Sequence, residues 1–172
     1  RHPRARRLTG LLGTGDRAMN FWSFSLQVYG KPGVAEACIA LQDGLGLDVN
    51  LLLYCCWHGR AHRKLDEAAL RHAMAAVEGW QREVVQPLRA VRRRLKSGVP
   101  PITARECLAL RRKVTDLEIE GERIAQTALE ALPAPPAGRR SAVAANLELY
   151  LRLRGREVAK APELQALVEA CG

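Results

Sequence analysis

Aromatic residues are scarce in this chain, and most of those present lie in one place. The 172 residues include three Trp, three Tyr and two Phe. Six of these eight lie between Phe21 and Trp57, in a stretch that carries few charges. Because aromatic side chains bury the most apolar surface per residue, this block is either an organising core or a docking surface.

Long apolar runs, a disulfide framework and nucleotide-binding motifs are also missing. The longest apolar run, Leu51 to Trp57, is too short to cross a bilayer, so we expect no membrane insertion. Five cysteines, an odd number, fit a reducing compartment, which predicts a cytoplasmic location. With no Gly-rich phosphate loop and no nucleophile elbow, we assign no catalytic residue and no cofactor, and an enzymatic role is disfavoured.

The first eighteen residues differ from the rest of the chain. They are rich in arginine, contain four Gly or Pro residues and precede an internal methionine, Met19. We interpret residues 1–18 as a disordered leader or a mis-assigned start. Residues 19–172 are then expected to form a single helical domain.

Helical spacing of apolar residues predicts an all-α fold of six or seven helices. Asn20 and Gly30 have the residue types that begin and end a short first helix. A second helix is expected between Pro32 and the glycines at 44 and 46. A third, Val49 to Trp57 with Asp48 as its N-cap, is apolar on nearly every side and should be the central buried element.

A long antiparallel helical hairpin follows, from about 66–96 and 103–131, with its turn at 97–102. Thr103 and Glu106 form a capping box that opens the second helix. Pro87 lies inside the first helix and removes a backbone donor, so we expect a kink near Glu83–Pro87.

The two helices of the hairpin share an apolar seam in which paired positions sum to about 201. The expected pairs are Leu95 with Cys107, Val91 with Leu110, Leu88 with Val114, Val84 with Leu117, and Gln81 with Gly121; Ile124 continues the seam. A Pro/Ala linker at 132–138 precedes two further helices. One runs from about 140 to 154, with Val143, Leu147, Tyr150 and Leu151 as its apolar stripe; the other runs from Pro162 to Ala170.

The net charge of the whole chain is +9, and positive charge is concentrated around the hairpin turn. Residues 89–113 contain nine basic side chains and Glu106 as the single acid. This tip is a candidate for binding a polyanion, nucleic acid or an acidic partner; the alternative is a solvated face. No aromatic residue interleaves the basic ones, so base stacking is not indicated. The candidate residues are Arg89, Arg92, Arg93, Arg94, Lys96, Arg105, Arg111, Arg112 and Lys113.

Cysteine and histidine residues suggest a second site. Cys55, His58 and His62 share one helical face if the third helix extends that far, and Cys38 and Cys56 are expected nearby. Free cysteine is often a small buried hydrophobe, and Gly59 interrupts the pattern, so we assign no metal and keep the three residues as candidates.

The aromatic block offers a third site. Its leading residues, Phe21 and Trp22, are candidates for an exposed anchor, because aromatic residues are typical interface hot spots. Burial in the core and local backbone capping are the alternatives. The candidate docking face consists of Phe21, Trp22, Gln42, Asp43, Asp48 and Asn50.

The same block resembles a family of small proteobacterial proteins of unknown function. The family's signature is similar to FWxFSLxVY, then PGV, ACxxLQD and GxDVNLLL. This chain has FWSFSL at 21–26, PGV at 32–34, Ala37-Cys38, LQD at 41–43 and DVNLLL at 48–53. The resemblance covers most of residues 20–130, implies a bacterial origin and a start at Met19, and brings no activity or ligand.

Together these patterns predict a non-enzymatic interaction or adaptor module with an unidentified protein partner. One alternative is RNA or DNA binding through the basic tip. Another is a metal- or small-molecule-dependent enzyme at the helix bearing Cys55 and His58.

Overall fold

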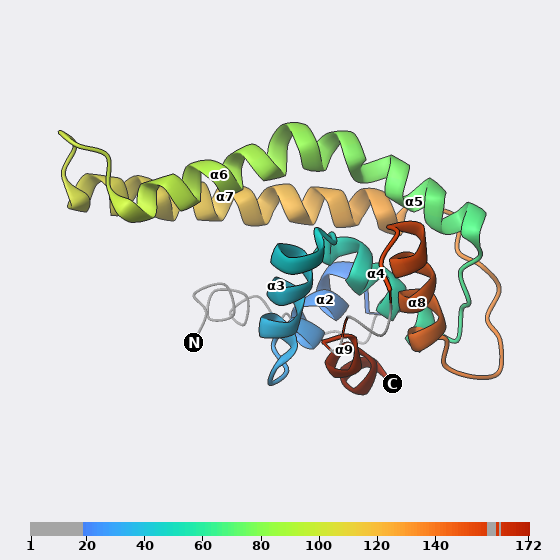
Figure 1. Ribbon diagram of the computed structural model, residues 1–172. Helices are drawn as coiled ribbons and strands as arrows, with labels where there is room; N and C mark the ends of the chain where they lie inside the picture. Colours follow the sequence, from blue (N-terminus) through green and yellow to red (C-terminus); the bar gives the residue numbers. More distant parts are fainter. Residues whose placement is uncertain (1–18, 158–160, 162) are drawn as a thin grey trace. The chain divides into compact units, whose positions relative to one another are not determined.

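The computed structural model describes residues 19–157, 161 and 163–172, and these residues form an all-α fold (Figure 1). The described part contains seven helical segments and no strand, counting the continuous α5, η2 and α6 as one. This confirms the predicted fold class. The predicted leader, residues 1–18, and Pro162 lie outside the described residues.

The described residues divide into two compact units: unit 1 lies within residues 19–74 and 130–172, and unit 2 spans residues 75–129. Unit 1 contains α2 (Phe21–Tyr29), α3 (Val34–Leu45), α4 (Val49–Arg60), the start of α5 (Glu67–Trp80), α8 (Val143–Leu153) and α9 (Leu164–Cys171). Helix α4 packs against α2, α3, α8 and α9, and all residues from 50 to 56 are buried. The predicted central buried helix is therefore confirmed.

The predicted caps at the start of unit 1 are also confirmed. Asn20 Oδ1 accepts a hydrogen bond from the Ser23 N–H at 2.8 Å, and Gly30 ends α2. Asp48 Oδ1 accepts from the Asn50 N–H at 2.8 Å and opens α4. These side chains satisfy amide groups that the first helical turn leaves unpaired.

Helix α4 runs to Arg60, three residues beyond the predicted end, because Gly59 serves packing rather than termination. A Cβ at Gly59 would lie 2.4 Å from Val143 N and 2.5 Å from Val143 Cα, so α8 approaches α4 where only glycine fits. The buried Asn146 of α8 fastens this junction. Its Nδ2 donates to the Cys55 and Arg63 carbonyls at 3.1 and 3.0 Å, and its Oδ1 accepts from Leu65 N–H at 2.9 Å.

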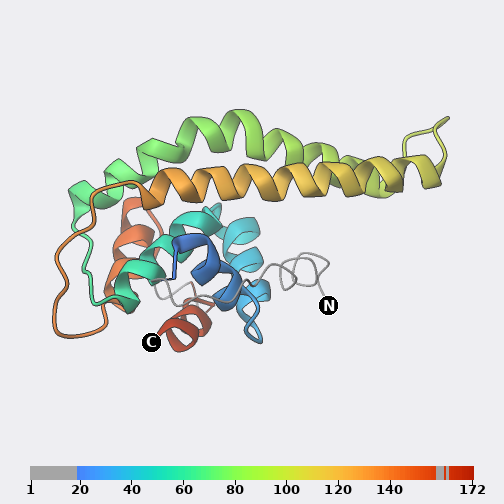
Figure 2. The same ribbon diagram turned by 180° about the vertical axis from the view of Figure 1, so that it is seen from behind.

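Unit 2 is the predicted helical hairpin. Its first arm comprises the end of α5, the π-helical turn η2 (Gln81–Val85), α6 (Gln86–Arg94) and the 3₁₀ turn η3 (Leu95–Ser97); its second arm is α7 (Ala104–Glu130). In Figures 1 and 2, α6 and α7 run side by side. The capping box is confirmed: Glu106 N–H donates to Thr103 Oγ1 at 3.3 Å, and Thr103 N–H donates to Glu106 Oε2 at 3.2 Å.

The irregularity expected near Glu83–Pro87 is a π-helical turn, η2, that precedes Pro87. Proline has no N–H to donate, and the wider i→i+5 turn accommodates this break in the α-helical pattern. A π turn takes up an extra residue and changes the register of the arm locally, while Leu88 and Leu95 beyond it keep their predicted seam positions. Val85, rather than Val84, is accordingly the fully buried residue.

Half of the predicted seam is therefore wrong. Leu95, Cys107 and Val114 form a buried cluster with Leu88 against it, as the predicted pairs require. Leu110, Leu117 and Ile124, however, are 50%, 57% and 44% exposed, and Val91 is also exposed. The residues one position later are more buried: Arg111 is half-buried, and Glu118 and Ala125 are buried. Gly121 faces Val85 and Trp80 rather than Gln81.

Candidate functional site

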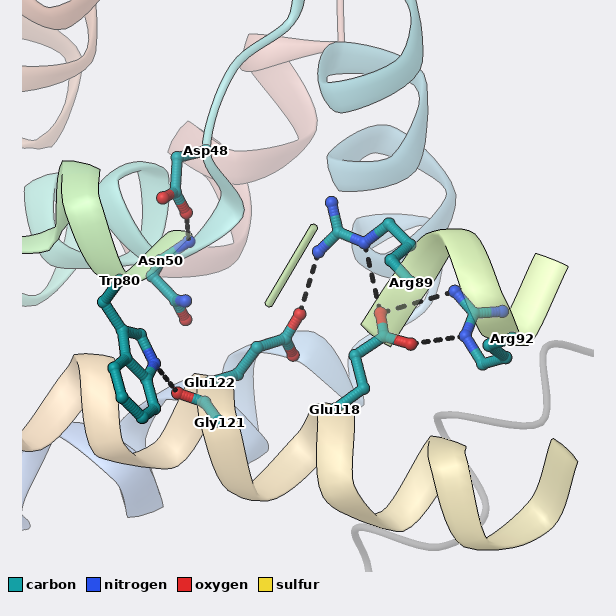
Figure 3. A network of polar contacts seen from close by, with 8 residues as sticks. All are labelled: Asp48, Asn50, Trp80, Arg89, Arg92, Glu118, Gly121 and Glu122. Atoms are coloured by element: carbon teal, nitrogen blue, oxygen red, sulfur yellow. Dashed lines mark hydrogen bonds and ion pairs between the residues drawn. The ribbon is translucent and has the colours of Figure 1, made fainter. Parts of the chain in front are cut away.

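A buried carboxylate lies between the two arms of the hairpin. Glu118 of α7 is 1% exposed, and its Oε1 accepts from Arg89 Nε at 3.1 Å (Figure 3). Arg92 donates to both oxygens of Glu118, and Arg89 Nη2 also pairs with Glu122 Oε1 at 3.0 Å. Charge-assisted bonds of this kind offset the cost of burying the carboxylate. We call these four residues the ion-pair edge.

Trp80 also joins the two arms of the hairpin. Trp80 Nε1 donates to the Gly121 carbonyl at 2.8 Å (Figure 3). A Cβ at Gly121 would lie 3.4 Å from a Val85 methyl group, an ordinary van der Waals contact, so Val85 of the facing arm lies against this position. Trp80 therefore couples the start of the π turn to the middle of α7.

The opposite edge of the hairpin is apolar. Leu117 precedes Glu118 by one residue, about 100° around the helix, so the two lie on opposite sides of the line through Val114 and Gly121. On the other arm, Val91 and Arg92 are related in the same way. Since Arg92 meets Glu118, Val91 falls on the side of Leu117. We call this set, which sequence reasoning placed in the seam, the apolar edge: Val91, Leu110, Leu117 and Ile124.

The structure divides the nine predicted tip residues. Arg89 and Arg92 turn inward to the ion-pair edge, Arg94 Nη1 donates to the Gly98 carbonyl at 2.6 Å, and Arg111 is half-buried. The side chains of Arg93, Lys96, Arg105, Arg112 and Lys113 are exposed near the turn, as is that of Arg94. Glu106 is engaged with Thr103, whose hydrogen bonds lower the pKa of its carboxyl.

The predicted docking face does not form one exposed surface. Phe21 is fully buried and stacks on Trp57 with ring centroids 5.1 Å apart, so it is a core residue rather than a projecting anchor. Asn50 is buried as well. Asp48 is half-buried; besides capping α4, its N–H donates to the Tyr150 hydroxyl at 3.0 Å. Trp22 and Gln42 are half-buried, and only Asp43 of the six is exposed.

The predicted face of Cys55, His58 and His62 depends on a helix that does not extend far enough. Helix α4 ends at Arg60, and His62 has a φ of 60°, outside helical geometry. No group of three or more His, Cys, Asp or Glu side chains in the described residues is placed to hold a metal ion. Burial, with a smaller effect of Arg63, lowers the pKa of His58 to about 4.

The cysteines around α4 are buried thiols. Burial raises the pKa of Cys55, and it raises that of Cys38 to about 12. The pKa of Cys56 is raised chiefly by its hydrogen bond to Cys171, and the same bond lowers the pKa of Cys171. Because the thiolate is the reactive form, Cys38, Cys55 and Cys56 are poor nucleophiles near neutral pH.

The described structure is thus an all-helical protein in which one unit is a hairpin with a charged and an apolar edge. Residues 20–129 match the family model described as "Protein of unknown function (DUF2390)", and the chain belongs to this family. The match includes both edges of the hairpin and ends before α8. Comparisons with curated proteins and with solved structures found no match. Among the described helices, none has the length and apolar character to span a bilayer.

Proposed function

We propose that this protein is a non-enzymatic protein-interaction module and that the apolar edge of its helical hairpin is the docking face. The observation that carries the proposal is an inversion on α7. Leu110, Leu117 and Ile124 are 44–57% exposed, while Glu118 is 1% exposed. A hairpin built only for stability would place the apolar residues in the seam and the carboxylate outside.

The spacing of the exposed residues fits a helical partner. Single exposed apolar side chains are common, but Leu110, Leu117 and Ile124 recur every seven residues and extend about 21 Å along α7. A seven-residue repeat keeps these side chains on one stripe of α7, along which a second helix can lie. Full burial of one such side chain contributes about 1.5–3 kcal/mol, so completing the burial of all three contributes several kcal/mol to binding.

The test compares two exposed surfaces of one helix. The double variant Leu110→Gln/Leu117→Gln removes the apolar edge, and Leu108→Gln is a matched control, because Leu108 is 49% exposed on the opposite edge. Proteins captured from lysate by the wild type are identified, purified and titrated against each variant. We expect the double variant to lose binding by tenfold or more, about 1.4 kcal/mol, with little change for the control. Equal binding by all three proteins contradicts the proposal.

The basic end of the hairpin supports a second candidate, binding of nucleic acid or another polyanion. Its favouring observation is that the single acid of residues 89–113, Glu106, is engaged in a helix cap while six basic side chains are exposed near the turn. Binding to a DNA or RNA oligonucleotide is then expected to weaken steeply with salt, with a log–log slope of several units. Arg112→Gln/Lys113→Gln should reduce this slope, and Arg123→Gln on the acidic half should not; absent or salt-insensitive binding rejects this candidate.

A further inference from the structure

We infer that the partner at the apolar edge is a second copy of this chain, with the two α7 helices packed antiparallel about Leu117. This inference rests on the proposed function, because it takes the apolar edge as the docking face. It adds the identity of the occupant and the geometry of the pair.

The part of the apolar edge that lies on α7 is symmetric about its middle residue, Leu117. Leu110 precedes Leu117 by seven residues, and Ile124 follows it by seven. A twofold axis at Leu117 therefore brings Leu110 of one copy against Ile124 of the other, twice, with the two Leu117 side chains at the centre. Such an interface uses the same surface on both copies and closes on itself.

Charged residues beside the apolar edge have the same symmetry. Lys113 lies four residues before Leu117 and Glu120 lies three residues after it; helical geometry places both on the outer side of the edge, away from Glu118. In the antiparallel pair, Lys113 of each copy lies opposite Glu120 of the other. A parallel pair would instead bring Lys113 against Lys113.

The wider charge distribution favours the same arrangement. Apart from the ion-pair edge, whose four charges pair within the hairpin, residues 93–113 are strongly basic, whereas residues 114–130 carry Asp116, Glu120 and Glu130 against Arg123. Antiparallel hairpins place the basic part of one copy beside the acidic part of the other. Complementary potentials of this kind set orientation and accelerate encounter.

The ion pair that Glu120 forms within its own helix does not prevent it from pairing with Lys113 of the second copy. Glu120 Oε1 pairs with Arg123 Nη2 at 2.6 Å, but both side chains are about half exposed. Exposed ion pairs three residues apart on a helix contribute little to its stability. Glu120 is thus able to turn to Lys113 of the second copy at little cost to the helix.

Sedimentation velocity over a concentration series tests the inference. The wild type and the control Leu108→Gln should show a concentration-dependent monomer–dimer equilibrium, and Leu117→Glu should be monomeric because it places like charges at the twofold axis. Lys113→Glu and Glu120→Lys should each weaken association roughly tenfold. The double variant Lys113→Glu/Glu120→Lys should recover most of the loss, since the pairs re-form with reversed signs. Circular dichroism establishes that each variant is folded.

Two results overturn the second copy as the occupant. One is a wild type that stays monomeric throughout the series; the other is a dimer indifferent to Leu117→Glu and to the charge exchange. These outcomes are distinct from failure of the proposed function. A monomer that still binds another protein through Leu110 and Leu117 retains the docking face and loses only the homodimer, whereas a monomer whose binding ignores both residues loses both proposals.

Discussion

Leu117 and Glu118 are neighbours on α7, yet Leu117 is 57% exposed and Glu118 is 1% exposed. In a monomeric hairpin their positions are the reverse of what the hydrophobic effect alone favours. Two arginines of the facing arm compensate for burial of the carboxylate, and an apolar edge is left on the surface. Architecture and proposed function both follow from this pair.

Loss of the Glu118 carboxylate should destabilise the hairpin. Glu118→Gln leaves Arg89 and Arg92, whose side chains are 14% and 15% exposed, without their shared counter-charge. Breaking a buried pair in this way typically costs about 3 kcal/mol in the free energy of unfolding. Urea denaturation followed by circular dichroism measures it. The control is Glu120→Gln, whose half-exposed ion pair should contribute little to the free energy of unfolding; equal effects would show that Glu118 is not a buried anchor.

Two glycines in helices should respond to alanine with opposite signs. Gly59→Ala drives a Cβ into the Val143 backbone and should lower the free energy of unfolding by about 3 kcal/mol. Gly79→Ala meets nothing within 4 Å and should raise it by roughly 0.5–1 kcal/mol, because alanine loses less entropy in a helix. Thermal or urea unfolding of the two variants provides the comparison, and a stable Gly59→Ala protein would refute the close approach of α4 and α8.

The stability of the protein should depend on pH through His58. Its pKa in the folded state is about 4, below the ordinary value of 6.5, so the unfolded chain takes up this proton first as the pH falls. The stability that comes from keeping His58 neutral is fully present above about pH 6.5. It is lost toward pH 4, where the free energy of unfolding has fallen by about 3 kcal/mol in all. Urea midpoints measured between pH 4 and 7 should fall more steeply for the wild type than for His58→Phe.

The same variant tests burial of the imidazole. Neither ring nitrogen of His58 has a hydrogen-bond partner among the described residues, and the ring lies 4.4 Å from that of Tyr54. His58→Phe should therefore be at least as stable as the wild type at pH 7. His72→Gln, at an exposed site, serves as the control for removing an imidazole and should change the stability at pH 7 little. A large loss of stability in His58→Phe at pH 7 would point to an unrecognised polar role.

Asn146 should contribute more than an ordinary helix cap. Asn146→Ala removes three hydrogen bonds to buried backbone groups around the end of α4, at a cost of about 3 kcal/mol. Asn20→Ala removes one cap at an exposed helix end and should cost about 1 kcal/mol. Denaturant titration of both variants gives the loss in the free energy of unfolding for each. Similar small losses would mean that water readily replaces the Asn146 contacts.

Local chemistry made much of the fold predictable. Asn20, Asp48 and the Thr103–Glu106 box act within three residues of themselves, so their sequence signals survive any tertiary arrangement. The apolar character of residues 49–57 likewise predicts a buried helix wherever its partners come from. Buried Asn146 was missed because its partners lie more than 80 residues away, and a single asparagine gives no periodic signal.

The hairpin seam was harder to predict because its register depends on contacts between the arms. An uninterrupted 3–4 spacing placed Val91, Leu110 and Leu117 inside. The π turn before Pro87 changes the register locally, so that Val85 rather than Val84 is fully buried. The Trp80–Gly121 and Arg–Glu118 contacts hold α7 with Glu118 rather than Leu117 inside. The docking candidate Phe21 was misplaced for a related reason, since its stacking on Trp57 joins residues 36 positions apart.

The most direct measurement of the central claim is the thiol-labelling rate of a Leu117→Cys variant over a range of protein concentrations. The five native cysteines are buried, so the new thiol is the expected fast-reacting group. We expect rapid labelling of position 117 in dilute solution, slowing as the protein concentration rises and the second copy covers this position. In a background carrying Lys113→Glu the slowing should require higher concentration. Slow labelling at every concentration, in both backgrounds, would place Leu117 in the seam and contradict the account.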